Sequence, residues 1–216
     1  MNIGIILAAG QGQRFGSNLP KQFSLLNDKM IIDYSIETFE SIKNINKIII
    51  VTPQEWVDKI SKLYPKHLVI KGGATRQESS FSALKKCPKN TKNVLIHDSA
   101  RPFISKSIIN KCLLSLKNNS AVIVSKKSTD TIIRVKNGKI IKIEKREELF
   151  LNQTPQAFEY KIILNAHIKK TAIATDDFSL LKINDIKCKI IEGPNYNIKI
   201  TTEQDLKIAE ALLHNL

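Results

Sequence analysis

The first apolar segment of the chain runs directly into a glycine-rich loop. Residues 3–9 are short, β-branched and continuously apolar, a pattern typical of a strand buried on both faces of a parallel sheet. Gly10, Gly12 and Gly16 follow, and missing side chains there let the backbone approach an anion closely. Arg14 and Lys21 add positive charge. The sequence therefore predicts an α/β protein that begins with a phosphate-gripping strand and loop.

The glycine spacing differs from the two commonest phosphate-binding fingerprints. A dinucleotide-binding loop needs G-x-G-x-x-G, but Phe15 stands where the third glycine would fall. A P-loop places Lys and then Ser or Thr directly after its last glycine, and this chain has Ser17 and Asn18 there. Taken alone, the loop is equally consistent with an ordinary turn between a strand and a helix, so later residues must decide.

Apolar runs alternate with segments of helical periodicity along most of the chain. Further strands are predicted at residues 47–52, 67–70, 93–97, 121–125 and 188–192. Pro53, Thr75 and Ser105 mark helix starts between them, and later helices are predicted at about 159–170, 176–183 and from a Thr201 cap to 213. This alternation predicts a mostly parallel sheet with right-handed crossovers.

The alternation breaks at about residues 127–150. Two β-rich runs, 131–135 and 139–143, flank Asn137-Gly138, the strongest short hairpin signal. We expect this hairpin to project as an arm from a single domain spanning residues 1–216. Because two apolar strands are unstable alone, we expect the arm to pack on a second subunit, giving a homodimer.

Charge and composition limit the kinds of ligand and partner that the chain is expected to bind. The net charge of +14 suits anionic substrates, but the chain has no run of five basic residues and no interleaved aromatic residues. We therefore expect a lysine-rich solvated surface rather than a nucleic-acid site. No apolar run approaches about 20 residues, so no membrane segment is expected and the location should be cytoplasmic. The three cysteines have no zinc or disulfide spacing.

Six short motifs occur in a fixed order and cover nearly the whole chain. They are Leu7-Ala8-Ala9-Gly10 with Arg14, Gly16 and Pro20-Lys21-Gln22; Gly72-Gly73-Ala74-Thr75-Arg76; His97-Asp98-Ser99-Ala100-Arg101-Pro102; Gln153-Thr154-Pro155-Gln156; Thr175-Asp176-Asp177; and Asn197-Ile198-Lys199-Ile200-Thr201. This set resembles the cytidylyltransferases that act on 2-C-methyl-D-erythritol 4-phosphate. The resemblance implies Mg²⁺-dependent transfer of CMP from CTP to a phosphorylated sugar alcohol. It also implies a Rossmann-like α/β fold, with helices on both faces of the sheet and a dimerising β-arm.

The resemblance also implies roles for individual residues. The catalytic cations would be Arg14, Lys21 and Lys199. The nucleotide-binding residues would be Ala8, Ala9, Gly10, Gly12, Gly73, Arg76, Ser79 and Ser99. The phosphorylated alcohol would meet Thr131, Arg146, Asp98 and Arg101, and Asp98 would also hold the metal. Tyr196 is left without a role, and Thr175-Asp176-Asp177 is assigned to capping and packing.

Elementary chemistry agrees with these roles. Attack of a phosphate oxygen on the α-phosphorus of a nucleotide crowds negative charge, which positioned cations offset without a covalent nucleophile. Asp98 follows a predicted strand at the carboxyl edge of the sheet, where open α/β sheets bind ligands. One carboxylate, triphosphate oxygens and water suffice for Mg²⁺. His97 is interpreted as a packed strand residue.

Two other functions stay open on these residues. The related ribitol 5-phosphate cytidylyltransferases share most of the motifs, and they would place the chain in cell-envelope polymer synthesis. A basic nucleic-acid-binding protein is the alternative from another class, and it rests on the net charge alone.

Overall fold

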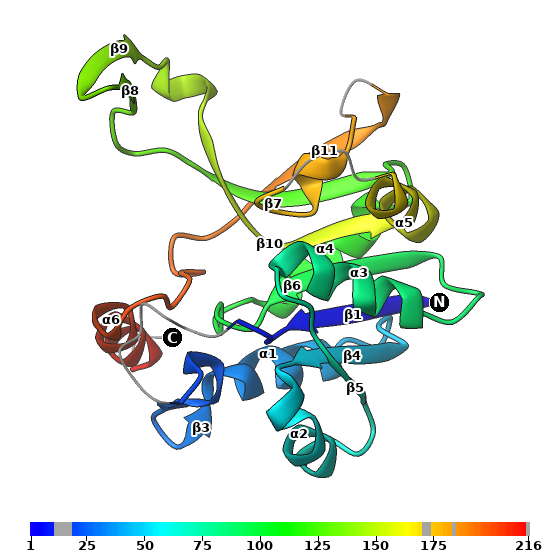
Figure 1. Ribbon diagram of the computed structural model, residues 1–216. Helices are drawn as coiled ribbons and strands as arrows, with labels where there is room; N and C mark the ends of the chain where they lie inside the picture. Colours follow the sequence, from blue (N-terminus) through cyan, green and yellow to red (C-terminus); the bar gives the residue numbers. More distant parts are fainter. Residues whose placement is uncertain (11–18, 170–173, 183–184, 215–216) are drawn as a thin grey trace.

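A central sheet of seven strands organises the protein (Figure 1). The computed structural model describes residues 1–10, 19–169, 174–182 and 185–214. The strand order is β11-β7-β10-β6-β1-β4-β5, and every neighbouring pair is parallel except those formed by β10. The strands are β1 (Asn2–Leu7), β4 (Lys47–Thr52), β5 (Leu68–Lys71), β6 (Asn93–Asp98), β7 (Ala121–Lys127), β10 (Phe150–Glu159) and β11 (Cys188–Glu192). The predicted mostly parallel sheet is confirmed.

Helices cover both faces of the sheet, as expected. Successive strand residues point to opposite faces, so Ile50 packs in one core cluster with α1, α2 and α4, whereas Ile49 and Val51 pack in another with α3 and α5. The helices are α1 (Ile31–Glu40), α2 (Val57–Leu63), α3 (Arg76–Lys86), α4 (Lys106–Ser115), α5 (Tyr160–Ile168) and α6 (Glu203–Leu213). Among the described residues, no helix is both long and apolar enough to cross a bilayer.

A smaller third core cluster joins the two ends of the chain. The hairpin of β2 (Leu25–Leu26) and β3 (Lys29–Met30) packs against α6 through Leu26, Ile200 and Ala209. Thr202 caps α6, with the Asp205 backbone amide 3.2 Å from its hydroxyl, so the predicted cap at Thr201 is wrong by one residue. The residues before α6, Lys199 among them, are thereby held near the N-terminal part of the chain.

The predicted arm is present and projects from the body (Figure 1). Its strands are β8 (Ile133–Lys136) and β9 (Lys139–Ile143). Asn137 and Gly138 both have positive φ, 51° and 74°, as a tight hairpin turn requires. All arm strand residues are exposed, including Ile140 at 62% and Ile143 at 65%.

Two further predictions need correction. β10 was not predicted, because Pro155 cannot donate to a ladder and polar residues surround it; the pairing register shifts between Asn152 and Gln156. The helix predicted at 176–183 is only the short 3₁₀ turn η4 (Phe178–Leu180) among the described residues. The Phe178 amide donates to the Gln156 side chain, which holds this segment on the sheet.

Candidate active site

A pocket of about 630 Å³ opens where the strand order of the sheet reverses. β4 and β5 lie on one side of β1 and β6 on the other, and the pocket lies beyond the carboxyl ends of β1 and β6. Open α/β sheets bind ligands at this position. The predicted residues that line it are Ala8, Ala9, Gly10, Lys21, Gly73, Arg76, Ser79, Asp98, Ser99 and Lys199. Arg14 and Gly12 lie outside the described residues.

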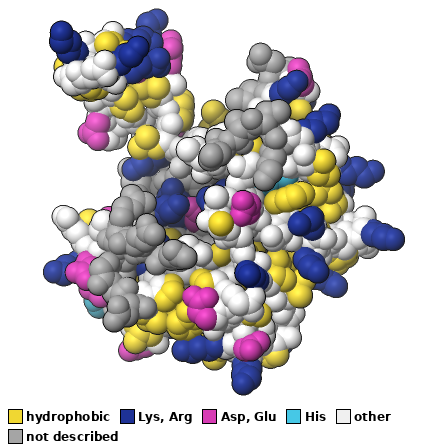
Figure 2. Space-filling model, in the orientation of Figure 1, with side chains coloured by type: hydrophobic (Ala, Val, Ile, Leu, Met, Phe, Trp, Pro, Cys, Tyr) yellow, Lys and Arg dark blue, Asp and Glu magenta, His cyan; other side chains and the backbone are white. Residues whose placement is uncertain are grey.

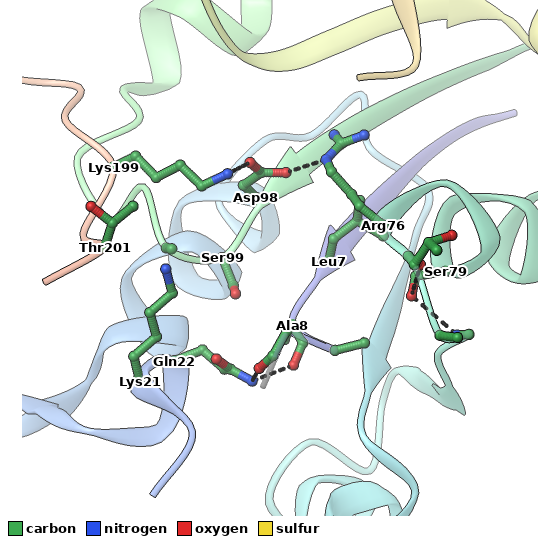
Figure 3. Close-up of a pocket in the computed structure, with 16 residues that line it drawn as sticks. Leu7, Ala8, Lys21, Gln22, Arg76, Ser79, Asp98, Ser99, Lys199 and Thr201 are labelled. Carbon is green, nitrogen blue, oxygen red and sulfur yellow. Dashed lines mark hydrogen bonds and ion pairs between the residues drawn. The ribbon is translucent and has the colours of Figure 1, made fainter. Parts of the chain in front are cut away.

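Gln22 fixes the start of the glycine-rich loop. Its side chain is 2% exposed and donates from Nε2 to the carbonyl oxygens of Ala8 and Gly10, at 2.6 and 3.0 Å. These two hydrogen bonds connect the 3₁₀ turn η1 (Lys21–Phe23) to the end of β1 and place Lys21 at the pocket wall (Figure 3). The Lys21 ammonium donates to the carbonyl of Ile200 at 2.7 Å, so two distant segments meet at this cation.

The Gly72-Gly73 pair is required by close packing beside the pocket. A Cβ at Gly72 would lie 2.3 Å from that of Ala9, and one at Gly73 would lie 2.3 Å from that of Glu78. Ser79 accepts a hydrogen bond from the Gly73 amide at 3.1 Å and donates to the Thr75 carbonyl at 2.9 Å. The Ser79 hydroxyl, in the first turn of α3, therefore holds the 72–75 segment in place through these two hydrogen bonds.

Asp98 lies between two cations (Figure 3). Arg76 Nε donates to one carboxylate oxygen at 3.0 Å, and Lys199 Nζ donates to the other at 2.6 Å. Burial opposes ionisation of Asp98, but the charges of Arg76 and Lys199 hold its pKa well below the usual value. The pocket therefore contains an ionised carboxylate that is paired with a partly exposed lysine.

His97 organises the turn that carries Asp98. Its Nε2 lies 3.1 Å from the Arg101 carbonyl, and since a carbonyl only accepts, Nε2 carries the proton. Its Nδ1 then accepts from the Thr154 hydroxyl at 3.0 Å, and that hydroxyl accepts from the Asp98 amide at 3.1 Å. The interpretation of His97 as a buried strand residue is correct, and its ring also connects β6 to β10.

The buried neutral imidazole should make folding sensitive to acid. Burial lowers the pKa of His97 to about 4. The unfolded chain therefore takes up this proton at higher pH than the folded one, and stability falls as pH drops below about 6.5. We expect this residue to remove about 2 kcal/mol of unfolding free energy between pH 7 and pH 4.5. Urea unfolding of the metal-free protein at both values measures it.

The control for this acid effect is the His97→Gln variant, which cannot titrate. Asp98 and Asp177 have lowered pKa values from a reference of 3.8, so their stabilisation is lost mainly below this pH window. An equal loss of stability between pH 7 and 4.5 in the variant and the unmodified chain would contradict the role given to His97.

Arg101 faces a backbone segment instead of the pocket. Its Nη1 donates to the Asn197 carbonyl at 2.7 Å, and Asn197 in turn donates to Gln153 at 3.0 Å. These bonds fix the chain just before Lys199. The predicted contact of Arg101 with the phosphorylated alcohol stays a prediction, as does the chemistry assigned to the other site residues.

Thr131 and Arg146 lie apart from the other predicted site residues. Both are exposed on the arm, and Arg146 Nη1 donates to the Thr129 carbonyl at 3.3 Å. Neither is among the described residues that line the pocket. Conversely, Gln22, Thr75 and Thr201 line the pocket without having been assigned to it. Their position inside the ordered motifs was the only sequence signal for them.

The Rossmann-like sheet and the cation-lined pocket at its strand reversal define a nucleotide-binding α/β protein. A sequence model of the family described as IspD, 2-C-methyl-D-erythritol 4-phosphate cytidylyltransferase, matches residues 3–215. The chain belongs to this family.

Named relatives cover nearly all of the chain. It is 36% identical over 218 residues to the 2-C-methyl-D-erythritol 4-phosphate cytidylyltransferase of Thermosipho africanus, covering 96% of each. It is 40% identical over 205 residues to the bifunctional enzyme IspD/IspF of Pelagibacter ubique, covering 94% of this chain but only 55% of that enzyme. The crystal structure of 4-diphosphocytidyl-2C-methyl-D-erythritol synthase from Anaerococcus prevotii superposes with a TM-score of 0.88 at 29% identity, covering 99% of this chain and 96% of the other.

Proposed function

We infer that this protein transfers CMP from CTP to 2-C-methyl-D-erythritol 4-phosphate, giving 4-diphosphocytidyl-2-C-methyl-D-erythritol and pyrophosphate for isoprenoid precursor synthesis. The family match over residues 3–215 carries this conclusion. A phosphate oxygen of the alcohol attacks the α-phosphorus of CTP, and the bond to the β-phosphate oxygen breaks as pyrophosphate leaves. The cytoplasmic location remains a prediction.

Lys21 and Lys199 are the cations proposed to stabilise this reaction, with Arg14 as a third. Both lysines line the pocket, and they come from opposite ends of the chain. Fixed positive charge at a developing five-coordinate phosphorus lowers the barrier without a covalent intermediate. The backbone of Ala8, Ala9 and Gly10 and the close turn at Gly73 are proposed to surround the nucleotide.

Asp98 is the residue proposed to hold Mg²⁺. It is the one carboxylate among the described residues that line the pocket. Across the described part of the chain, no group of three or more His, Cys, Asp or Glu residues is arranged to hold a metal ion. An ionised carboxylate has about four lone-pair positions, so Asp98 can bind a cation while keeping one of its present partners. Its hard oxygens suit Mg²⁺, which would supply positive charge to offset the charge of the phosphates.

Pyrophosphate release in the presence of CTP and Mg²⁺ tests the proposed function. We expect release with 2-C-methyl-D-erythritol 4-phosphate, and little with ribitol 5-phosphate or when ATP, GTP or UTP replaces CTP. Preference for ribitol 5-phosphate would move the protein to cell-envelope polymer synthesis. No release with either alcohol would leave the family fold intact and the activity wrong.

The arm is proposed to pack on a second copy of the chain. Figure 2 shows hydrophobic and basic side chains together on the arm, which stands apart from the body. A lone two-stranded hairpin is at best marginally stable, and Ile140, Ile141 and Ile143 are 55–65% exposed. Size-exclusion chromatography with light scattering should therefore give a dimer, and a clean monomer would contradict this proposal.

Arg146 offers a separate test of the arm. Replacing Arg146 by Gln should raise the KM for the phosphorylated alcohol about tenfold to a hundredfold, since a charged hydrogen bond contributes about 1.5–3 kcal/mol. The KM for CTP should stay nearly unchanged. Arg134→Gln is the matched control, because Arg134 lies on the same arm and pairs with Glu144. The reverse pattern of KM values would move Arg146 to the nucleotide.

A further inference from the structure

A fully buried carboxylate lies behind the pocket. The side chain of Asp177 has 0% exposure and accepts three side-chain hydrogen bonds. The donors are Arg76 Nη1 at 2.6 Å, His167 Nε2 at 2.9 Å and Ser80 Oγ at 3.2 Å. A buried charge is costly unless it is paired and hydrogen-bonded in this way. Asp177 thereby joins α3 to the last turn of α5.

This role differs from the capping assigned to the Thr175-Asp176-Asp177 motif. Asp176 does act as a cap, because its Oδ1 accepts from the Ser179 amide at 2.9 Å. Asp177 makes no side-chain bond to the 3₁₀ turn that follows it. Burial opposes its ionisation, but the hydrogen bond from His167 and the charge of Arg76 keep the pKa of Asp177 below its usual value. The two adjacent aspartates therefore have different tasks.

Arg76 connects Asp177 to the pocket. Its planar guanidinium donates from Nη1 to Asp177 and from Nε to Asp98, which fixes both the position and the plane of the fork. Asp98 then presents its second oxygen to Lys199 (Figure 3). Negative and positive side chains alternate in the row Asp177, Arg76, Asp98 and Lys199. Displacement of Asp177 would therefore change the electrostatic interactions of Lys199.

The sheet holds Asp177 independently of Arg76. The neighbouring Asp176 accepts from Gln156 Nε2 at 2.7 Å, and the Phe178 amide donates to Gln156 Oε1 at 3.1 Å. Gln156 lies on β10, the strand whose Thr154 binds the Asp98 amide. Asp177 is thus placed before any ligand arrives, as a positioning group must be.

We propose that Asp177 is a positioning residue for cytidylyl transfer: it anchors Arg76, and through Arg76 it sets the place of the Asp98 carboxylate against Lys199. This inference rests on the proposed function. Without Asp177, Arg76 can rotate about its bond to Asp98 and compete with Lys199 for the Asp98 carboxylate. The reacting phosphates then face a pocket with a different arrangement of charges.

The Asp177→Asn variant tests this proposal, because asparagine keeps the shape and removes the charge. We expect kcat to fall about tenfold to a hundredfold, the usual effect of losing an outer partner of a site, while the KM for the phosphorylated alcohol changes little. Asp176→Asn is the matched control, since it disturbs the same segment without touching Arg76. Equal falls in kcat for the two variants would reduce Asp177 to a structural role.

A double-mutant cycle measured on kcat distinguishes an effect of Asp177 through Arg76 from a purely structural role of Asp177. If Asp177 acts through Arg76, the double variant Arg76→Gln, Asp177→Asn should have the same kcat as Arg76→Gln alone. Additive losses would overturn the inference.

Hydrogen exchange at Arg76 Nε, followed by NMR, separates this inference from the proposed function. The exchange should be slow in the unmodified chain and in Asp176→Asn, and at least tenfold faster in Asp177→Asn. Unchanged exchange overturns the anchor whatever the enzymatic activity. Should Asp177→Asn fail to fold, Ser80→Ala removes one neutral hydrogen bond to Asp177, and the same resonance must still exchange faster.

Discussion

Replacing Asp98 by Asn should lower the turnover number about a thousandfold, the upper range for a single preorganised electrostatic group. Two effects act in the same direction. Arg76 and Lys199 lose the negative charge that they share, and an amide nitrogen meets one of the two cations. The proposed metal also loses the carboxylate that would hold it. Steady-state turnover with saturating CTP and alcohol measures the loss.

The matched control for Asp98→Asn is Asp58→Asn. Asp58 is on α2 and is not among the residues that line the pocket, and its replacement changes the net charge equally. The Asp98 variant should also unfold more easily, because removing one partner of a buried ion pair costs about 3–5 kcal/mol. Urea unfolding identifies the conditions in which it is folded. Turnover within tenfold of the unmodified chain, in folded protein, would remove Asp98 from the chemistry.

Three of the strands that the sequence predicts share one physical property. β1, β4 and β6 are buried on both faces, so their apolar residues form uninterrupted runs that no other local structure explains as well. β10 is buried too, but it uses Gln153, Thr154 and Gln156 there. These side chains bind His97, Asn197 and the 176–178 segment, and such long-range partners leave no periodic trace in the sequence.

The site was predictable to the extent that its motifs are local. Lys21, Asp98 and Lys199 meet in one pocket, as the ordered motifs indicated. Arg101 also belongs to one of the ordered motifs, but its guanidinium binds the Asn197 carbonyl, which is 96 residues away in the sequence. The anchor at Asp177 was hidden for the same reason, because its partner Arg76 is 101 residues distant and nothing near Asp177 indicates burial.

Replacing Lys21 by Met should lower turnover about a hundredfold to a thousandfold, because it removes a cation that we propose to stabilise transition-state charge. Methionine keeps much of the apolar stem, so packing beside Gln22 should survive. The bond to the Ile200 carbonyl is lost, and any general loosening of the C-terminal segment would appear as reduced unfolding free energy.

Lys29→Met is the matched control for Lys21→Met. Lys29 carries the same charge on β3, where it pairs with Glu37 at the surface. The decisive comparison is between kcat and the KM for CTP in the two variants. If Lys21 serves the transition state, kcat falls far more than the affinity for CTP, since uniform binding would raise KM alone. A variant with raised KM and normal kcat would make Lys21 a nucleotide-binding residue and leave the catalytic charge to Lys199 and Arg14.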